Sequence, residues 1–454
     1  MLESLIHEVE SMKNFLILFI LIFLPIFALA QDMPFTVRST TNYSVSSMIG
    51  RVEIDSVKYN QIRFIQEFRY KKFGLGLDLD FLFDKNFKLR ESDWDHIEDI
   101  LGKFYYFRYA EVGDPFFFHF GGFSNYTIGN GLVMLNYSNM HYYPDLRHNG
   151  LLIGGCMDTR IKPKVEVFSS DVQKSQILAM NATIQPLPYS TLKYIDQGIL
   201  GMSLYADRNQ YGNLKHALGD SLYQIHKPDD KDAVVVAGLD YSQPFAQSDN
   251  AEFGVYAEVA HIFDSGTGFI LPGVYADFDV VKLNLEYRVH GDKFSPGFFD
   301  HFYEEERAML DTLSMTVVTK QEAVNQMQAS RGFYGKINAT IAKKFKTMVA
   351  WQNMHGNNLI GGKSLWFSMN LDTQYKRLER VGISYSKTGV EKLSLGKVAV
   401  PRARLSTSIT MSLNEKRRWF FIAKYSEKYP DKDGDIKWWK DTQRSFGLGV
   451  KYVY

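Results

Sequence analysis

The chain has 454 residues, with 52 lysines and arginines against 51 aspartates and glutamates, which leaves a formal net charge of +1 at pH 7. This balance gives no indication of a nucleic-acid partner or of a strongly charged substrate. The single cysteine, Cys156, excludes an internal disulfide, and aromatic residues make up 15% of the chain. So many aromatic residues are unusual for a soluble enzyme and suit a protein with aromatic girdles at two membrane–water interfaces.

The start of the chain has the organisation of a secretory signal peptide, which we expect to cover residues 1–30. A lysine precedes the apolar run Phe15–Phe27, and the small-residue sequence Ala28–Ala30 follows it. The run is shorter than the roughly 20 residues that an α-helix needs to cross a bilayer. We therefore expect export and cleavage, with an N-terminal membrane anchor as the alternative. The acidic residues 1–11 favour Met12 as the true start.

Segments in which apolar and polar residues alternate recur along the rest of the chain. The most regular are 61–70, 73–83, 281–290 and 402–413. Successive side chains of a strand point to opposite faces, so each segment is interpreted as a strand with one apolar and one polar face. Each has ten residues or more, whereas strands of globular proteins most often have about five or six. Since no helical stretch after residue 30 is suited to crossing a membrane, the pattern predicts an all-β, antiparallel, up-and-down transmembrane β-barrel.

The connections between these segments alternate between short turns and long loops. The short ones are 71–72, 161–164, 277–279, 343–345, 372–378 and 413–416. The long ones are 85–100, 124–149, 208–232, 291–330, 388–401 and 428–442. In outer-membrane barrels short turns lie at one end and longer loops at the other. We therefore expect a single domain, residues 31–454, with an even number of strands, about 16–20.

One loop, 291–330, carries helical signals. Thr319–Glu322 has the pattern of a capping box and predicts a short helix that ends near Ala329. Other apolar residues of this loop have near-helical spacing: Phe302, Met309, Leu310 and Leu313. We expect a helical insertion near 300–329 that either folds into the lumen or caps the barrel from outside.

A second loop region, residues 113–150, combines glycine, asparagine and aromatic residues with an apolar island at 132–135. An exposed loop has little reason to hold such an island, so we expect the segment to pack inside the barrel or across its mouth as a constriction or gate. The alternatives are an ordinary strand and loop, or a surface that contacts a partner. The constriction candidates are Leu132, Met134, Tyr137 and His141.

The sequence contains only weak candidates for catalytic and metal-binding motifs. The best catalytic candidates are Ser138, His141 and Asp145, with His119 as a further histidine. Closeness in sequence does not bring a nucleophile, a base and an orienting group within reach of one another. The stretch 431–435 resembles the start of a calcium-binding loop, but its twelfth position is Thr442 where a glutamate is needed. We therefore expect no enzyme, no metal site and no cofactor.

The last ten residues, 445–454, alternate apolar or aromatic residues with small or polar ones and end on Tyr454. An unpaired terminal strand exposes a sticky edge, so we expect it to pair with the first strand and close the barrel. The segment resembles the C-terminal signature of bacterial outer-membrane β-barrels, although it identifies no specific family. That resemblance implies a location in a Gram-negative outer membrane and recognition of the last strand by the barrel-assembly machinery.

The predicted architecture allows three functions. The first is a porin-like channel for passive passage of small solutes, with weak ion selectivity because the inward face carries charges of both signs. The second is a gated transporter of hydrophobic compounds with 113–150 as its hatch, and the third is a barrel enzyme or a structural surface protein. The expected partners are membrane lipid and small solutes, and homo-oligomer formation is left open. The residues expected to line the pore are Arg63, Glu67, Arg69, Asp78, Asp80, Lys282, Glu286, Arg288, Arg402 and Arg404.

Overall fold

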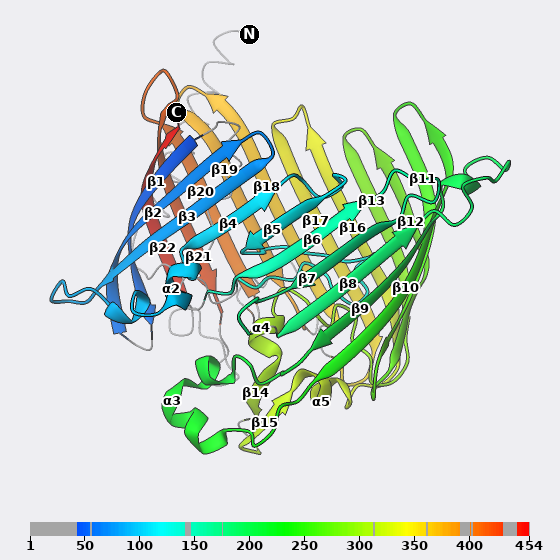
Figure 1. Ribbon diagram of the computed structural model, residues 1–454, viewed down its shortest axis with the longest axis horizontal. Coiled ribbons are helices and arrows are strands. Elements are labelled where there is room, and N and C mark those ends of the chain that lie inside the picture. Colours follow the sequence, from blue (N-terminus) through cyan, green and yellow to red (C-terminus); the bar gives the residue numbers. More distant parts are fainter. Residues whose placement is uncertain are drawn as a thin grey trace, which may run out of the picture.

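The computed structural model describes residues 43–453, apart from 55–56, 141–146, 175, 312–313, 360–361, 391–399, 401–402 and 430–442. Several expectations fall outside the described residues: the signal peptide, His141, Asp145, Arg402, Leu313, the calcium-like stretch 431–435, and Tyr454. Within the described part, 20 strands form one antiparallel sheet that closes on itself (Figure 1). The predicted all-β barrel with an even number of strands is confirmed.

The strands follow one another around the wall in chain order. The first ten are β1 (Tyr43–Ile54), β2 (Val57–Tyr70), β3 (Phe73–Phe83), β4 (Phe104–Tyr109), β5 (Phe117–Gly121), β6 (Gly150–Cys156), β7 (Lys164–Ser169), β8 (Ile177–Ile184), β9 (Ile199–Asp207) and β10 (Val234–Ser248). The others are β11 (Ala251–Ile262), β12 (Thr267–Phe278), β13 (Val281–His290), β16 (Ser330–Ile341), β17 (Phe345–Gly356), β18 (Lys363–Tyr375), β19 (Leu378–Lys387), β20 (Ala403–Ser412), β21 (Trp419–Lys428) and β22 (Gln443–Val453).

The barrel closes where the last strand pairs with the first, as predicted. Ser46 is opposite Lys451 and Gly50 is opposite Gly447 in the β1–β22 ladder. On the inner side of this seam the Met48 side chain packs over Gly447, where an added Cβ would lie 2.9 Å from the Met48 Sδ and push that side chain aside. Closure pairs both edges of the 20-stranded sheet, so the described part of the wall has no open edge that could associate with another chain.

Turns and loops lie at opposite ends of the barrel. Because every pairing between consecutive wall strands is antiparallel, the predicted short connections all fall at one end and the predicted long ones at the other. Figure 1 shows the two chain ends near the turn end and α3 (Leu214–His226) with the β14–β15 hairpin at the loop end. The turn end also carries one longer connection, 185–198, which contains the short helix η2 (Ile195–Gln197).

The expected helical insertion is only partly helical. The loop contains α4 (Tyr303–Glu306), then a hairpin of β14 (Ala308–Asp311) and β15 (Thr316–Thr319), then α5 (Lys320–Val324). The capping box of Thr319 and Glu322 forms as predicted, but the helix that it opens ends at Val324 and not near Ala329. The prediction was wrong for Met309 and Leu310, because the β-branched sequence 316–319 favours a strand and pairs with them.

Helices also occur in two loops where none was predicted. One loop holds η1 (Glu91–Asp93) and α2 (Ile97–Gly102), and another holds α3. Gly219 interrupts α3 with a positive φ of 74°, so this element consists of two short helical pieces. None of the helices in the described part of the chain is both long and apolar enough to cross a membrane.

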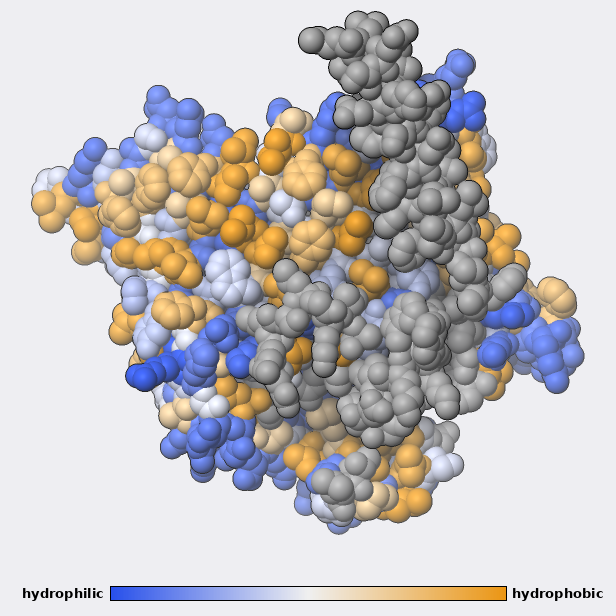
Figure 2. Space-filling view, turned by 180° about the vertical axis from the view of Figure 1, so that it is seen from behind, coloured by the Kyte–Doolittle hydropathy of each residue, from blue (hydrophilic) through white to orange (hydrophobic). Residues whose placement is uncertain are grey.

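The outer surface of the wall is apolar. Large hydrophobic side chains of alternate strand positions, such as Phe64, Leu204 and Phe333, are exposed on it. Figure 2 shows hydrophobic groups gathered in a broad zone over the strands, with hydrophilic groups toward the two ends. The opposite face of each strand points into the barrel, where the candidate site is found.

Candidate functional site

Two loops fold into the lumen and join there. Residues 122–140 follow β5, and residues 292–307 follow β13; together they are called the plug. Their backbones are hydrogen-bonded to each other, because Gly297 N donates to Leu132 O at 2.8 Å and Phe299 N donates to Val133 O at 2.9 Å. Since these loops are far apart in sequence, the plug is a product of the tertiary fold.

Most of the plug packs against one side of the wall, although Leu135 packs with Tyr334 of β16, Ala350 of β17 and Trp366 of β18. Its apolar side chains form a single buried cluster with inward residues of β6 to β12. Tyr126 stacks on Phe168 of β7 with ring centroids 4.7 Å apart, and Phe299 stacks on Tyr205 of β9 at 6.0 Å. Other members contributed by the wall are Leu152, Ile177, Ala179, Val234, Val236, Tyr256, Ala260, Ile262 and Ile270. Burying a large apolar side chain contributes about 1.5–3 kcal/mol, so this contact holds the plug firmly.

A buried arginine at the end of α4 ties the plug to the loop end of the wall. Arg307 donates from Nη2 to both carboxylate oxygens of Asp207, each at 2.8 Å, and to Asn209 O at 2.7 Å. Its Nη1 donates to Glu304 at 3.1 Å and to Gln176. Hydrogen bonds between a guanidinium and carboxylates are strong because both groups are charged, so this network fixes the orientation of α4.

Glu304 of α4 connects the two halves of the plug. The Tyr137 hydroxyl donates to it, and so does the Asn213 amide, at 2.5 Å. Burial raises the pKa of Glu304, but the nearby Arg307 and His148 and the hydrogen bonds more than offset this, so the pKa lies below the ordinary 4.5. The carboxylate therefore stabilises the plug above its ordinary pKa, and this contribution is lost as the pH falls through the lowered value.

The 122–140 segment of the plug is also bonded to wall carboxylates. Asn130 N donates to Glu258 of β11 at 2.9 Å, and the Tyr126 hydroxyl donates to Glu166 of β7 at 3.4 Å. These bonds satisfy polar groups that burial would otherwise leave unpaired, which is costly in a low-dielectric interior. The plug is thus held by apolar packing and by specific polar contacts.

The opposite wall, formed by β18, β19 and β20, has an inner face rich in hydroxyl groups. Directly opposed residues of antiparallel strands share a face, and the register pairs Ser368 with Ser384 and Ser384 with Ser406. The polar residues of this face, here called the hydroxyl wall, are Ser364, Ser368, Asn370, Ser384, Ser386, Ser406, Ser408 and Thr410. Most are half-exposed or exposed, so their hydroxyls and amides remain available to water or solute.

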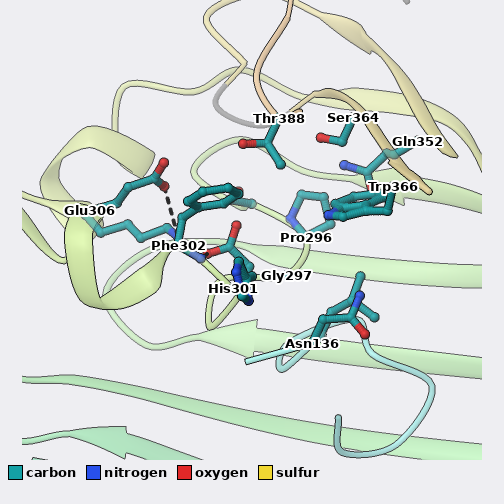
Figure 3. A pocket seen from close by; sticks show the side chains of 14 residues that line it. Asn136, Pro296, Gly297, His301, Phe302, Glu306, Gln352, Ser364, Trp366 and Thr388 are labelled. Carbon is teal, nitrogen blue, oxygen red and sulfur yellow. Dashed lines mark hydrogen bonds and ion pairs between the residues drawn. The ribbon is translucent and has the colours of Figure 1, made fainter. Parts of the chain in front are cut away.

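A small hollow, part of it open to solvent, lies between the plug and the inner face of β17 and β18. Its lining residues come from both sides: Leu135, Asn136, Ser295, Pro296, Gly297, Asp300, His301, Phe302, Glu306 and Lys320 from the plug and α5, and Gln352, Ser364, Trp366 and Thr388 from the wall and the loop after β19. Figure 3 shows Phe302 on one side of this space and Trp366 with Pro296 on the other.

The part of the wall near the seam carries paired charges. Arg63 donates from Nε and Nη2 to the two oxygens of Asp78 at 2.8 and 2.7 Å. Arg147 lies 3.5 Å from Asp78 and 3.5 Å from Asp80. Farther along, Glu67 is 3.5 Å from Lys451. Each of these three carboxylates therefore has a basic partner, and Lys424 of β21 lies near Arg63 and Lys451 as a further base.

The structure places the predicted pore-lining residues as follows. Six lie on the inner face and are buried, mostly in ion pairs: Arg63, Glu67, Asp78, Asp80, Glu286 and Arg288. Arg69 is half-buried, Lys282 is exposed at the turn end beside Asp277, and Arg404 lies 3.8 Å from Glu305 of the plug. Alternation located the inward face, but it could not show that most of these charges are bound by other side chains.

The predicted constriction residues fill the plug and do not face the hollow. Leu132, Met134 and Tyr137 are fully buried, whereas their neighbours Leu135 and Asn136 line the open space. Sequence reasoning missed the wall residues of the hollow, above all Trp366. The available signal was the run of serines and threonines at alternate positions in 402–413, which marks the hydroxyl wall.

The catalytic candidates that are described have backbone partners. Ser138 is 2% exposed, and its Oγ accepts a hydrogen bond from Met140 N at 3.2 Å. A ring nitrogen of His119 lies 3.2 Å from Gly122 O. Among the residues that the structure describes, no three histidine, cysteine or acidic side chains are grouped as metal ligands would be.

Comparisons with known proteins return likenesses of architecture only. No family model and no curated protein matches the chain. Among solved structures, OprD of Pseudomonas aeruginosa matches at 8% identity, with 91% of this chain and 94% of that chain covered and a TM-score of 0.30. OccK2 (OpdF) of the same organism, solved with glucuronate, matches at 7% identity, 91% and 97% coverage and a TM-score of 0.32.

A further similar structure is Wzi of Escherichia coli, described as an outer-membrane, carbohydrate-binding β-barrel involved in group 1 capsule assembly. It matches at 10% identity, covers 91% of this chain and 85% of that chain, and has a TM-score of 0.34. These values are too low to transfer the function of any of the three. The chain's own strand pairing defines its class, a closed up-and-down β-barrel of the kind found in outer membranes, as its last strand indicated.

Proposed function

We propose that the protein is a channel of a Gram-negative outer membrane through which small hydrophilic solutes pass passively. The apolar outer face of the closed barrel supports a place in lipid, because closure satisfies every wall strand within the sheet. The expected signal peptide and the C-terminal signature support export and insertion by the barrel-assembly machinery. Membrane lipid is then a permanent partner, and homo-oligomer formation stays open.

One observation carries the proposal of a channel: most apolar side chains of the plug pack on the β6–β12 side, while the polar side chains of the hydroxyl wall stay half-exposed or exposed. Hydroxyl and amide groups along a passage replace part of the hydration shell of a polar solute. Arg63 and Asp78 near the seam are paired, and the acids Asp300 and Glu306 at the hollow are paired with Lys320. Weak ion selectivity follows from such neutralisation.

A transporter of hydrophobic compounds is less well supported. Such a transporter needs a path lined by apolar side chains, but most apolar side chains of the plug are turned toward the β6–β12 wall and buried there. An enzymatic role has no support from Ser138 or His119, whose polar atoms have backbone partners. We therefore propose a non-enzymatic channel without a cofactor.

Reconstitution of the purified protein into planar bilayers tests the proposal. We expect stepwise conductance with a reversal potential close to zero in a salt gradient, and swelling of proteoliposomes in isotonic solutions of small polar solutes. Detergent without protein serves as the control. Insertion of folded barrels without conductance steps or swelling would contradict a channel and favour a sealed structural barrel.

A further inference from the structure

The turns that join β16 to β17, β18 to β19, β20 to β21 and β2 to β3 are basic. Every residue of four stretches is an exposed lysine or arginine: 71–72, 343–344, 376–377 and 416–418. These stretches, here called the basic rim, follow one another around the turn end, because the wall runs from β16 to β22 and on to β1, β2 and β3. Neighbouring strands lie about 4.8 Å apart, so each turn from β16 to β21 lies roughly 10 Å from the next, a distance comparable to the Debye length. The charges of adjacent turns therefore act together.

Few members of the basic rim have an acidic partner. Lys72 lies 3.1 Å from Asp114, and Arg417 lies 3.3 Å from Glu379. Among the residues that the structure describes, no carboxylate forms an ion pair with the lysines 71, 343, 344 and 376. Their ammonium groups are therefore available to a negatively charged partner from outside the chain.

The opposite arc of the turn end has a different composition. The turns 249–250 and 279–280 contain an aspartate each and no basic residue, and Arg160 and Lys162 share their turn with Asp158. The basic character therefore belongs to one arc and is not a general property of the turns.

The backbone of the basic turns does not favour lysine or arginine. Four members of the basic rim have a left-handed φ between 50° and 58°: Lys71, Lys343, Lys376 and Arg417. Glycine and asparagine adopt this conformation more readily than residues with long side chains, and they are the usual choice in two-residue hairpin turns. Turn geometry therefore does not account for the basic residues, whereas a role for their charge does.

The basic rim borders the apolar outer face of the wall. Tyr70, Tyr375 and Trp419 lie next to its members in the chain, and all three are exposed. Lys71 Nζ lies 5.4 Å from the centroid of the Tyr70 ring, and Lys376 Nζ lies 5.4 Å from that of Tyr375. Because tyrosine and tryptophan prefer the membrane–water interface, these ammonium groups lie at the depth of lipid headgroups.

We infer that the basic rim binds the phosphate groups of anionic phospholipids, such as phosphatidylglycerol, in the leaflet at the turn end. The inference rests on the proposed place in a membrane, but not on conduction. Phosphate oxygens accept charge-assisted hydrogen bonds from ammonium and guanidinium groups, and the acyl chains of the same lipid contact the apolar face beside the rim. A free phosphate ion gains only the first of these contacts. A zwitterionic lipid is attracted less, because its own ammonium group offsets its phosphate.

Quenching of tryptophan fluorescence by brominated lipids tests the inference, since Trp419 adjoins the basic rim. The protein is reconstituted in phosphatidylcholine vesicles that contain a minor fraction of phosphatidylglycerol, with bromine on the acyl chains of one lipid or the other. The difference between the wild type and Trp419→Phe gives the quenching at this position. Phosphatidylglycerol should associate here about fivefold more strongly than phosphatidylcholine, the factor that corresponds to about 1 kcal/mol. High salt should reduce this preference.

Two charge variants locate the binding. The rim variant replaces four lysines by glutamine and should lose the preference: Lys71→Gln, Lys343→Gln, Lys344→Gln and Lys376→Gln. Arginine at the same four positions keeps the charge and should retain the preference. The matched control removes the same charge from exposed lysines of the loop end and should behave like the wild type: Lys85→Gln, Lys88→Gln, Lys227→Gln and Lys231→Gln.

The outcomes separate the inference from the proposed function. Equal quenching by the two lipids, or a preference that survives in the rim variant, contradicts the inference and points to an acidic soluble partner. A preference that the control variant also loses contradicts it as well. So does a preference that inorganic phosphate removes more effectively than sodium chloride at the same ionic strength, since this indicates a site for free phosphate. A barrel that does not insert into the vesicles contradicts its proposed place in a membrane.

Discussion

The wall of β6 to β12 and the wall of β18 to β20 belong to one sheet and alternate in the same way, yet their inner faces differ. The first presents residues such as Phe168, Tyr205 and Val236 to the lumen, and the second presents serine, threonine and asparagine. The plug packs mainly on the first, and it meets the second at only a few residues, with Leu135 in one cluster with Trp366 and Glu305 lying 3.8 Å from Arg404.

The physical reason lies in what each inner face gains from contact with a loop. Apolar side chains gain about 25 cal/mol for each Å² of apolar surface removed from water, so an inward apolar wall draws a loop that carries an apolar island. Hydroxyl groups gain little when a loop replaces water as their partner. The composition of the inner face therefore determines on which side the lumen is filled.

Removal of the plug's first segment should reduce the difference between the covered wall and the open wall more than any single substitution. Replacing residues 126–140 by a short Gly-Ser linker should raise the single-channel conductance roughly twofold or more, because conductance grows with the open cross-section of a pore. Shortening the outer part of α3, residues 217–226, removes a similar length from the loop end and serves as the control. Unchanged conductance after the first deletion would show that the plug does not obstruct the lumen.

Loss of the Arg307 network should loosen the plug without deleting it. Arg307→Ala leaves Asp207 and Glu304 buried without their partner, which costs about 3–5 kcal/mol. Chemical unfolding followed by tryptophan fluorescence should show this loss, and bilayer recordings should show larger current fluctuations. Arg331→Ala, on the exposed outer face of β16, should change stability by no more than about 0.5 kcal/mol. Equal effects of the two substitutions would argue against a structural role for the network.

Accessibility of single cysteines to a thiol reagent should distinguish the two walls while disturbing the barrel least. In a Cys156→Ala background, a water-soluble methanethiosulfonate reagent should reduce the conductance of Ser408→Cys, because this position lies on the hydroxyl wall. Thr407→Cys points to the opposite face of β20 and should not respond. Ala260→Cys points inward but lies under the plug, so it should also be unreactive. Rapid modification at position 260 would mean that the plug leaves its wall in the membrane.

Much of the wall could be predicted because strand patterns are local. The alternation in 61–70 or 402–413 reports the two faces of a strand directly, and the turn signals order the strands when every neighbour in sequence is also a neighbour in space. The capping box was likewise predictable, since its two residues, Thr319 and Glu322, are only three positions apart. The helix α3 was missed because Gly219 divides it into two short pieces. The β14–β15 hairpin was missed because the short β-branched run 316–319 favours a strand over the helix that the apolar spacing predicted.

The sequence by itself determined a barrel and its inward face, because both depend on the order of residues along one strand. It indicated 113–150 as a segment of the lumen or mouth and left 291–330 open between the lumen and an outer cap. The tertiary structure alone decided which charges are neutralised, as Arg63 is by Asp78, and which wall the plug covers. It also brought Phe302 and Trp366 to opposite sides of one hollow. These contacts join segments far apart in the chain, and their partners are chosen by packing inside the closed barrel, which no local pattern records.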